Sequence, residues 1–188
     1  MTGVQTCALP ICLYRIVPKA VVKVNSEEEV IRLLQFCNSE NVPVTFKAAG
    51  TSLSGQIVSD ALLMEIGQGF DFSAITDNGH LATFGVGLTG MAANRMLQRY
   101  RRKIGPKPAS IHSAKIGSIV SNNASGSSYG IRHNSYNTVK SMRIVFVDGW
   151  LLDTSDSISC ENFINAHPAF VAQIRALHRE VKIGRAHV

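Results

Sequence analysis

The segment from Pro43 to Gln56, P-V-T-F-K-A-A-G-T-S-L-S-G-Q, has the composition of an anion-binding loop. A short β-rich run, Val42 to Phe46, leads into small residues, and no bulky side chain stands between Ala48 and Ser52. Such a loop lets backbone N–H groups approach a ligand closely, and successive N–H groups that point the same way bind an anion. A phosphate or a diphosphate fits this chemistry. An ordinary strand-to-turn connection has the same composition, so this segment alone leaves both interpretations open.

The spacing of this first loop is not that of the common phosphate-binding loops. The chain has neither G-x-x-x-x-G-K-[ST] nor G-x-G-x-x-G in this segment. It is also not the serine elbow of hydrolases, because Ser52 has Gly50 two residues before it but Ser54 two residues after it. The first loop is therefore a candidate phosphate site of a different kind.

A second segment, from Gly105 to Arg132, is rich in Gly, Ser, Asn and Pro, and its polarity predicts no regular structure. It contains K-P-A-S, followed by K-I-G-S-I-V-S-N-N-A-S-G-S-S-Y-G from Lys115 to Gly130. Small residues again permit a close backbone approach. A loop of this length in a compact domain is usually functional or disordered, although a surface loop with Asx turns is the alternative.

Apolar periodicity predicts the elements that position these loops. Ser26 and Glu29 form a capping-box pattern at the start of a helix that should end near Asn38 to Asn41. Strands are predicted on either side of it, at Val21–Val24, Val42–Phe46 and Ala61–Ile66. These elements make a β-α-β unit followed by another strand.

The second half of the chain predicts hairpins and helices. Asp77-Asn78-Gly79 and Asp148-Gly149 are hairpin signals. The strands that flank these turns are expected at Phe72–Ile75 and Leu81–Val86, and at Ser141–Val147 and Trp150–Asp153. Helices are expected at Thr89–Arg101 and at Phe163–Lys182, the second interrupted near Pro168. The predicted class is α+β, with a small β-α-β subdomain, a second mixed or antiparallel sheet, and flanking helices.

Composition is that of a globular protein of 188 residues, with 45% hydrophobic and 17% charged residues and a net charge of +6. The apolar runs are shorter than the roughly 20 residues that span a bilayer. The basic cluster Arg99–Lys103 is best interpreted as a solvated helix end, and the positive charge suits an anionic cofactor and an acidic substrate.

The absence of C-x-x-C argues against a disulfide scaffold and a metal site in this chain, and Cys37 is expected to be a buried structural thiol.

Both ends of the chain resemble translated sequencing adapter, one strand at each end. We therefore expect residues 1–11 and 183–188 to be non-native and exclude them from the fold prediction. The expectation that follows is an internal fragment of a longer gene.

Several ordered motifs together resemble one protein family. They are P-V-T-F-K-A-A-G-T-S-L-S-G-Q, G-P-K-P-A-S, I-G-S-I-V-S-N-N-A-S-G and N-S-Y-N-T-V-K-S-M-R-I-V-F-V-D-G. These motifs resemble those of the FAD-linked oxidases of the vanillyl-alcohol oxidase and para-cresol methylhydroxylase (PCMH) type. Within that superfamily it is most similar to D-lactate/D-2-hydroxyacid dehydrogenases, particularly the large forms with an iron–sulfur domain. The resemblance places a C-terminally truncated FAD-binding domain at residues 14–156 and the helical start of a following segment at 157–182.

The resemblance implies a role for each loop. The first loop would hold the FAD diphosphate, and the second would wrap the middle of the cofactor and the flavin edge, with Tyr129 just beyond. The implied cofactor-binding residues are Ala48, Ala49, Gly50, Thr51, Ser52, Leu53, Gly55 and Gln56 in the first loop, and Pro108, Ser110, Ile116, Gly117, Ser118, Asn122, Asn123, Ser125, Gly126 and Gly130 in the second.

This sequence departs from the family pattern at three positions. Lys47 stands where many relatives have Arg, which keeps the charge but loses the bidentate fork. Ser118 replaces a second glycine. Thr51 stands in the region where relatives with covalently attached flavin have His, so we expect non-covalent FAD.

The family chemistry is hydride transfer from the α-carbon of a 2-hydroxy acid to flavin. In relatives the catalytic base and the carboxylate-binding group come from a cap domain beyond this chain, so no catalytic residue is assigned here. His112 and His133 are interpreted as hydrogen-bonded loop histidines. The implied partners are a small 2-hydroxy acid and an electron acceptor, namely a quinone, a cytochrome or an iron–sulfur domain, with an iron–sulfur cluster expected only outside this chain.

Two alternatives stay open at this point. One keeps the fold and changes the substrate, as in a nucleotide-sugar reductase or an alkylglycerone-phosphate-type synthase. The other is a non-enzymatic nucleotide- or RNA-binding module, which lacks the aromatic residues interleaved with basic ones that single-strand binders use, so no nucleic-acid partner is expected. The expected location is cytoplasmic, or peripheral to the inner membrane.

Overall fold

The computed structural model describes residues 16–124, 126 and 131–184. The adapter-like segment 1–11, most of 183–188, and the second-loop residues Ser125, Tyr129 and Gly130 lie outside the described residues. The chain divides into two compact units. The described part of the first runs to Val139 and includes Val147–Gly149, and the second comprises Lys140–Phe146 and the residues from Trp150 onward.

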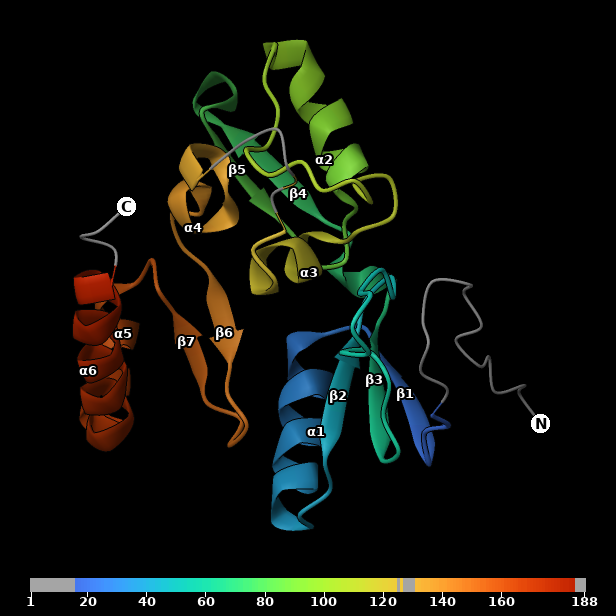
Figure 1. Ribbon diagram of the computed structural model, residues 1–188, viewed down its shortest axis with the longest axis vertical. Helices are drawn as coiled ribbons and strands as arrows, with labels where there is room; N and C mark the ends of the chain where they lie inside the picture. Colours follow the sequence, from blue (N-terminus) through green and yellow to red (C-terminus); the bar gives the residue numbers. More distant parts are fainter. Residues whose placement is uncertain (1–15, 125, 127–130, 185–188) are drawn as a thin grey trace. The chain divides into compact units, whose positions relative to one another are not determined.

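The first unit begins with a three-stranded parallel sheet and one helix (Figure 1). The elements are β1 (Ala20–Val24), α1 (Glu27–Ser39), β2 (Val44–Lys47) and β3 (Leu62–Ile66). β3 is central and pairs with both neighbours, so that Val24 lies opposite Ile66 and Lys47 opposite Glu65. Because the strands are parallel, their carboxyl ends meet at one edge of the sheet.

The predicted β-α-β unit is confirmed, with strand boundaries that shift by one or two residues. β2 begins at Val44 rather than Val42, because the Val42 N–H donates to the Cys37 carbonyl at 2.8 Å and so completes the end of α1. Proline at 43 has no N–H to offer a ladder.

The start of α1 uses the predicted cap residues in a slightly different way. The Ser26 Oγ accepts from the Glu29 N–H at 3.2 Å, as expected. The Glu29 carboxylate, however, accepts from the N–H of Asn25 at 2.6 Å, one residue before the cap. Both bonds fix the path of the chain from β1 into α1.

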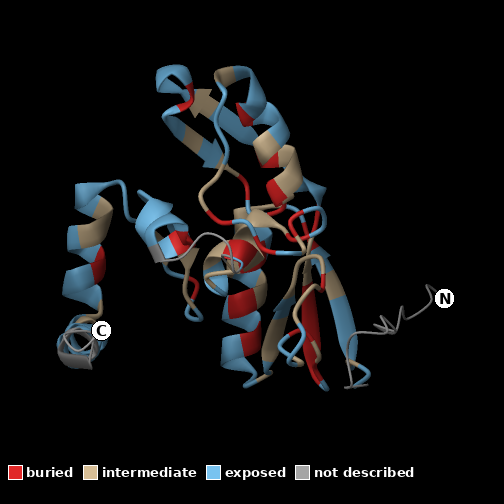
Figure 2. Cartoon of the chain, turned by 45° about the horizontal axis from the view of Figure 1, so that its top comes forward, coloured by how far each residue is buried: buried red, intermediate tan, exposed pale blue. Residues whose placement is uncertain are grey.

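Buried residues of β3, of the end of β1 and of one side of α1 form the core of the β-α-β unit (Figure 2). Met64 is fully buried, and Val24 and Cys37 are each 2% exposed. Burial raises the pKa of the Cys37 thiol above its ordinary value. The expectation of a buried structural cysteine is confirmed.

The rest of the first unit contains an antiparallel hairpin and a helix. β4 (Ser73–Thr76) pairs with β5 (Leu81–Phe84) across the 3₁₀ turn Asp77–Gly79, as the sequence predicted. α2 (Gly90–Leu97) continues as a 3₁₀ turn, Gln98–Tyr100, and ends at Arg101 in the left-handed conformation, with φ 56°. The basic cluster Arg99–Lys103 lies at this exposed end, which confirms its interpretation.

The second loop contains regular structure that the sequence analysis did not predict. α3 spans Ile116–Ser121, and a 3₁₀ turn, Ile131–His133, is followed by α4 (Ser135–Thr138). The prediction of an irregular segment was wrong because Ile116, Ile119 and Val120 recur at helical spacing among the polar residues. Ile119 is 1% exposed, so α3 is held by burial rather than by intrinsic helix propensity.

The second unit combines a hairpin with two helices, β6 (Arg143–Val145), β7 (Leu151–Asp153), α5 (Ser157–Ala166) and α6 (Pro168–Gly184). The antiparallel strands of the chain therefore form separate two-stranded sheets within the described residues. The helix break near Pro168 is confirmed. The first of the two helices begins before the predicted Phe163, because the Asp156 carboxylate accepts from the Ile158 and Ser159 N–H groups and caps it at Ser157.

An aromatic cluster joins the hairpin of the second unit to its helices. The Phe163 ring stacks on Phe146 and on His167, with centroid distances of 4.7 and 4.5 Å. Trp150 meets the His167 ring edge-on at 5.1 Å, and Phe170 meets Phe146 edge-on at 5.6 Å. These contacts define how β6, β7, α5 and α6 pack.

No helix in the described part of the chain is long and apolar enough to cross a bilayer.

Asp153 makes the stability of the second unit depend on pH. Hydrogen bonds from the Ser155 Oγ at 2.5 Å and the Ser155 N–H at 2.9 Å, with Arg143 at 3.6 Å, lower the pKa of the Asp153 carboxyl. A carboxyl whose pKa is depressed in the folded state contributes stability above its unfolded pKa of about 3.9 and loses it as pH falls through the folded pKa.

We expect Asp153→Asn to reduce the free energy of unfolding at pH 6 and to have less effect at pH 3. Urea unfolding of both proteins at the two pH values measures this difference. An equal effect at pH 6 and pH 3 would show that the charge of Asp153 is not what stabilises the turn.

Candidate functional site

The first loop leaves β2 at the carboxyl edge of the parallel sheet. Lys47, the last residue of β2, lies opposite Glu65 in β3, and their side chains form an ion pair at 3.5 Å. From the second loop, the Lys115 Nζ donates to the carbonyl of Ile66, the last residue of β3, at 3.2 Å. The start of the K-I-G-S motif therefore lies at the edge from which the first loop departs. The structure brings together the starts of two segments that are far apart in sequence.

The backbone of the first loop is open to an anion. Among the described residues, none accepts a hydrogen bond from the backbone N–H groups of Ala48, Ala49, Gly50, Thr51, Ser52 or Leu53. Gly50 and Gly55 have φ of 73° and 78°, where a side chain is strained. A row of N–H groups without internal acceptors, in a loop turned by glycine, is the arrangement that binds a phosphate.

Gln56 closes this loop. Its side-chain oxygen accepts from the Ser54 N–H at 3.1 Å, and the Gly55 carbonyl accepts from Val58 at 3.2 Å. Gly50 is buried, whereas Thr51 and Ser52 are half-buried and Leu53 is 63% exposed. The middle of the loop is thus reachable from outside while its base is fixed.

The second loop is anchored through backbone bonds at the start of α3. Ile116 donates to Leu88 at 2.8 Å and Gly117 donates to Val86 at 3.0 Å. A Cβ at Gly117 would lie 2.9 Å from the Val86 Cβ, so glycine permits this close approach. The N–H groups of Ile116 and Gly117 are therefore already used in backbone hydrogen bonds. By contrast, no group among the described residues accepts a hydrogen bond from the Ser118 N–H.

Several predicted cofactor-binding side chains of the second loop also build the loop itself. The Ser118 Oγ donates to the Lys115 carbonyl at 2.9 Å, and the Asn122 Nδ2 donates to the Ser118 carbonyl at 3.0 Å. The Asn123 Oδ1 accepts from the N–H of the buried Ser135 at 3.0 Å. Sequence reasoning missed Ser135, because no local pattern pairs it with Asn123.

The two ends of the second loop approach each other at Gly126. Its φ is 73°, and a Cβ built there would lie 2.1 Å from the Lys107 carbonyl oxygen, so only glycine fits. Nearby, the buried Pro108 accepts from Ile111 at 3.0 Å and Ser110 accepts from Ala114 at 2.7 Å, both through their carbonyls. The predicted residues Pro108, Ser110 and Gly126 therefore lie where the two ends of the second loop approach each other.

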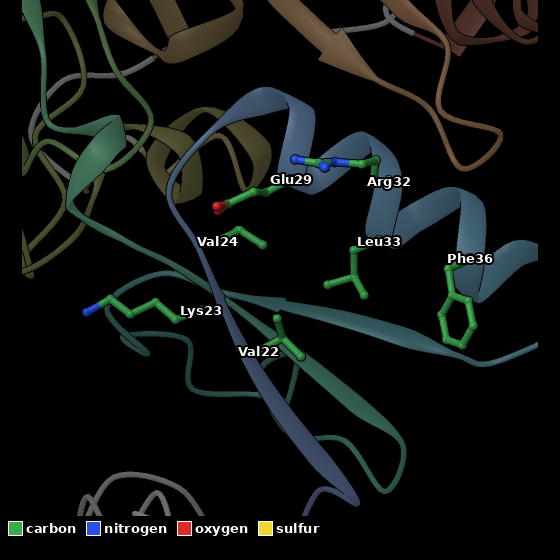
Figure 3. A pocket seen from close by; sticks show the side chains of 7 residues that line it. All are labelled: Val22, Lys23, Val24, Glu29, Arg32, Leu33 and Phe36. Carbon is green, nitrogen blue, oxygen red and sulfur yellow. The ribbon is translucent and has the colours of Figure 1, made fainter.

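A separate groove of about 410 Å³ lies between α1 and β1 (Figure 3). Leu33 and Phe36 of α1 face Val22 of the edge strand, and Lys23, Val24, Glu29 and Arg32 complete its lining. None of these residues comes from the two loops. The groove is therefore not the site that the sequence predicted.

The described residues were also compared with the requirements of a metal site. Within 16–124, 126 and 131–184, no group of three or more His, Cys, Asp and Glu side chains is placed to hold a metal ion. His112 and His133 are both exposed.

A family model for an FAD binding domain matches residues 18–155, well over half of the chain. This chain belongs to the FAD binding domain family. The prediction of a PCMH-type FAD-binding fold is confirmed.

Comparison with individual proteins agrees with this assignment. The chain is 27% identical over 139 residues to a D-lactate dehydrogenase of Archaeoglobus fulgidus, an alignment that covers 71% of this chain and 30% of that protein. The chain thus spans less than a third of the length of this curated relative.

Solved structures show the same fold. An alkyldihydroxyacetonephosphate synthase matches with a TM-score of 0.61 at 21% identity, over 74% of this chain and 27% of that one. A glucooligosaccharide oxidase from Acremonium strictum, whose FAD is described as 6-S-cysteinyl and 8α-N1-histidyl, matches with a TM-score of 0.60 at 17% identity, over 73% and 29% of the two chains.

The residues of this FAD-binding domain fit the cofactor. The open N–H groups from Ala48 to Leu53 suit the diphosphate, which needs several donors and no bulky neighbour. The individual cofactor contacts of both loops stay predictions, and the geometry favours the backbone of the first loop over the asparagine side chains of the second.

Proposed function

We propose that this domain holds FAD in an enzyme that oxidises D-lactate or a related D-2-hydroxy acid. The observation that carries the cofactor part is the row of backbone N–H groups at the carboxyl edge of the parallel sheet, without acceptors among the described residues. The substrate part is supported by the similarity to the D-lactate dehydrogenase of Archaeoglobus fulgidus. The likeness to the alkyldihydroxyacetonephosphate synthase concerns the fold alone.

The residues of the two loops bind and orient the cofactor. FAD, when bound, accepts the hydride from the α-carbon of the hydroxy acid. The first loop offers N–H donors that are already in place, so little reorganisation opposes diphosphate binding. Gly117 and Gly126 keep the second loop close to Val86 and Lys107. The groups that bind the substrate carboxylate and remove the hydroxyl proton are proposed to lie outside this chain.

Anaerobic mixing of the complete protein with substrate tests the function. We expect the flavin absorbance near 450 nm to bleach with D-lactate or another D-2-hydroxy acid and not with the L-enantiomers. Bleaching by none of these acids, in a protein that holds flavin, would favour the alternative of another substrate on the same fold. A protein that binds no flavin at all would contradict the cofactor assignment as well.

We expect FAD to be bound without a covalent bond. The first loop, from Pro43 to Gln56, contains neither His nor Cys. Denaturing the complete holoprotein in acid or guanidinium and filtering it should release all of the flavin into the filtrate. Flavin that stays with the denatured polypeptide would contradict this proposal.

The electron acceptor and the cellular location of the enzyme are further proposals. We propose a quinone, a cytochrome or an iron–sulfur domain as electron acceptor, and a cytoplasmic location, free or peripheral to the inner membrane. Reoxidation of the substrate-reduced flavin by a soluble quinone, compared with cytochrome c, would distinguish the first two acceptors.

A further inference from the structure

We propose that Lys115 is a positioning residue that ties the second cofactor loop to the edge of the sheet from which the first loop departs. The proposal rests on the proposed FAD site and names a residue outside the predicted cofactor set. The Lys115 side chain bonds to the backbone of Ile66, a residue that no sequence pattern relates to position 115. The bond from Nζ to the Ile66 carbonyl is 3.2 Å long and partly buried.

The anchor of this bond is fixed on the sheet side. Ile66 ends the central strand and lies opposite Val24 of β1. The next residue, Gly67, donates to the Val24 carbonyl at 2.8 Å, and a Cβ there would lie 2.2 Å from the Asn25 Oδ1. The carbonyl that receives the lysine therefore has little freedom to move.

The backbone of Lys115 connects two further elements. It forms an isolated antiparallel bridge with Thr89, whose side chain caps α2 through the Ala92 N–H at 3.2 Å. Its carbonyl accepts from the Ile119 N–H at 3.0 Å and from the Ser118 Oγ at 2.9 Å, at the start of α3. One residue thus links the parallel sheet to α2, which precedes the second loop, and to α3, which lies within it.

The charges at this edge distinguish Lys115 from Lys47. Lys47 is paired with Glu65 at 3.5 Å, whereas the Lys115 ammonium has only the Ile66 carbonyl as an acceptor among the described residues. A hydrogen bond from a charged donor is stronger than a neutral one, and a partly buried ammonium needs it. The Ile66 carbonyl therefore fixes the position of the Lys115 side chain, and with it the start of α3.

The test compares variants of the complete protein by amide hydrogen exchange without FAD and by titration with FAD and with ADP. Lys115→Met keeps the aliphatic stem and removes the donor. We expect exchange of the Ile116 and Gly117 amides to become about ten- to hundredfold faster, the range set by one hydrogen bond to a charged group, and the Kd for FAD to rise by a similar factor. ADP lacks the flavin that the second loop is proposed to wrap, so it should bind with nearly unchanged affinity.

Lys115→Arg keeps the charge and the donor and should restore both readouts. Lys140→Met removes the same charge from an exposed position and should change neither. If Lys115→Met does not fold, Lys115→Gln, which shortens the side chain and removes the charge, takes its place with the same expectations. Circular dichroism of each variant establishes that it is folded.

The outcomes separate the proposal from the cofactor assignment. Unchanged amide exchange in Lys115→Met or Lys115→Gln, or no rescue by arginine, would overturn the positioning role. An equal loss of FAD and ADP affinity with unchanged exchange would mean that the ammonium contacts the diphosphate, which also overturns it. If the wild-type protein binds no FAD, the proposed function fails, and the exchange measurement alone still decides the role of Lys115.

Discussion

Gly50→Ala is expected to weaken FAD binding by the complete protein by about ten- to hundredfold. Gly50 has φ 73° in the middle of the open N–H row of the first loop. A non-glycine residue in this conformation costs about 1–3 kcal/mol, and each 1.4 kcal/mol is tenfold in affinity. Alanine lets the unbound loop relax to another backbone conformation, so the strain is imposed when the loop closes on the diphosphate. Fluorescence titration of the apoprotein with FAD measures the effect.

Gly149→Ala is the matched control for Gly50→Ala. Gly149 has φ 84° in the turn between β6 and β7, outside both loops, and the atoms nearest to a Cβ built there belong to the flexible side chain of Gln35, the first at 2.6 Å. We expect a comparable loss of stability and no change in the Kd for FAD. Equal FAD affinities of the Gly50→Ala and wild-type proteins would show that the first loop does not hold the cofactor.

Ile119→Ala is expected to reduce the free energy of unfolding by about 2–5 kcal/mol, the range for a buried large aliphatic residue. Ile119 is 1% exposed, and its Cδ1 lies 2.9 Å from the position of a Cβ on Gly90, so it fills the space between α3 and α2. Its carbonyl accepts from Ala124 at 2.9 Å and from the Ser135 Oγ at 3.3 Å. Loss of this anchor loosens the second loop, so FAD affinity should fall as well.

Two substitutions control for this effect. Ile119→Val removes a single methylene and should cost about 0.5–1.5 kcal/mol. Ile158→Ala removes a side chain that is 67% exposed and should cost about 0.5 kcal/mol or less. Urea unfolding of the complete protein gives all three values. A cost for Ile119→Ala as small as that for Ile158→Ala would contradict the account of how the second loop is built.

Local signals in the sequence predicted most of the elements. The cap at Ser26, the apolar runs of β1 and β3 and the Asp-Gly and Asn-Gly turns depend on a few neighbouring residues, and a sequence displays such patterns directly. The β2 boundary was less predictable, because the Val42 N–H is used by the end of α1, and composition does not reveal that choice.

The second loop shows where local reasoning ends. Its polar composition concealed α3, since the burial that stabilises Ile119 comes from α2, and the Asn123–Ser135 bond joins residues whose pairing depends on the fold. Asn122 and Asn123 were predicted from the family resemblance to be cofactor-binding residues of this loop, and that stays a prediction. The sequence could not reveal that part of their hydrogen-bonding capacity is used within it.

Lys115 was visible in the sequence only as the first residue of a motif. Its importance arises from the parallel sheet, which places the end of β3 next to the end of β2 and thereby gives the lysine a carbonyl at the site. The first loop differs, because its small residues and glycine spacing predict an anion site without any tertiary contact, and that site stays a prediction.

Amide hydrogen exchange of the complete protein with and without FAD tests the central claim most directly. At a FAD concentration of about 100 times the Kd, we predict that exchange of the amides from Ala48 to Leu53 slows by up to about a hundredfold, because bound ligand stabilises the closed loop by about 2.7 kcal/mol. ADP should protect the same amides. Protection elsewhere in the protein, with unchanged exchange from Ala48 to Leu53 in the presence of bound FAD, would contradict the assignment of this loop as the diphosphate site.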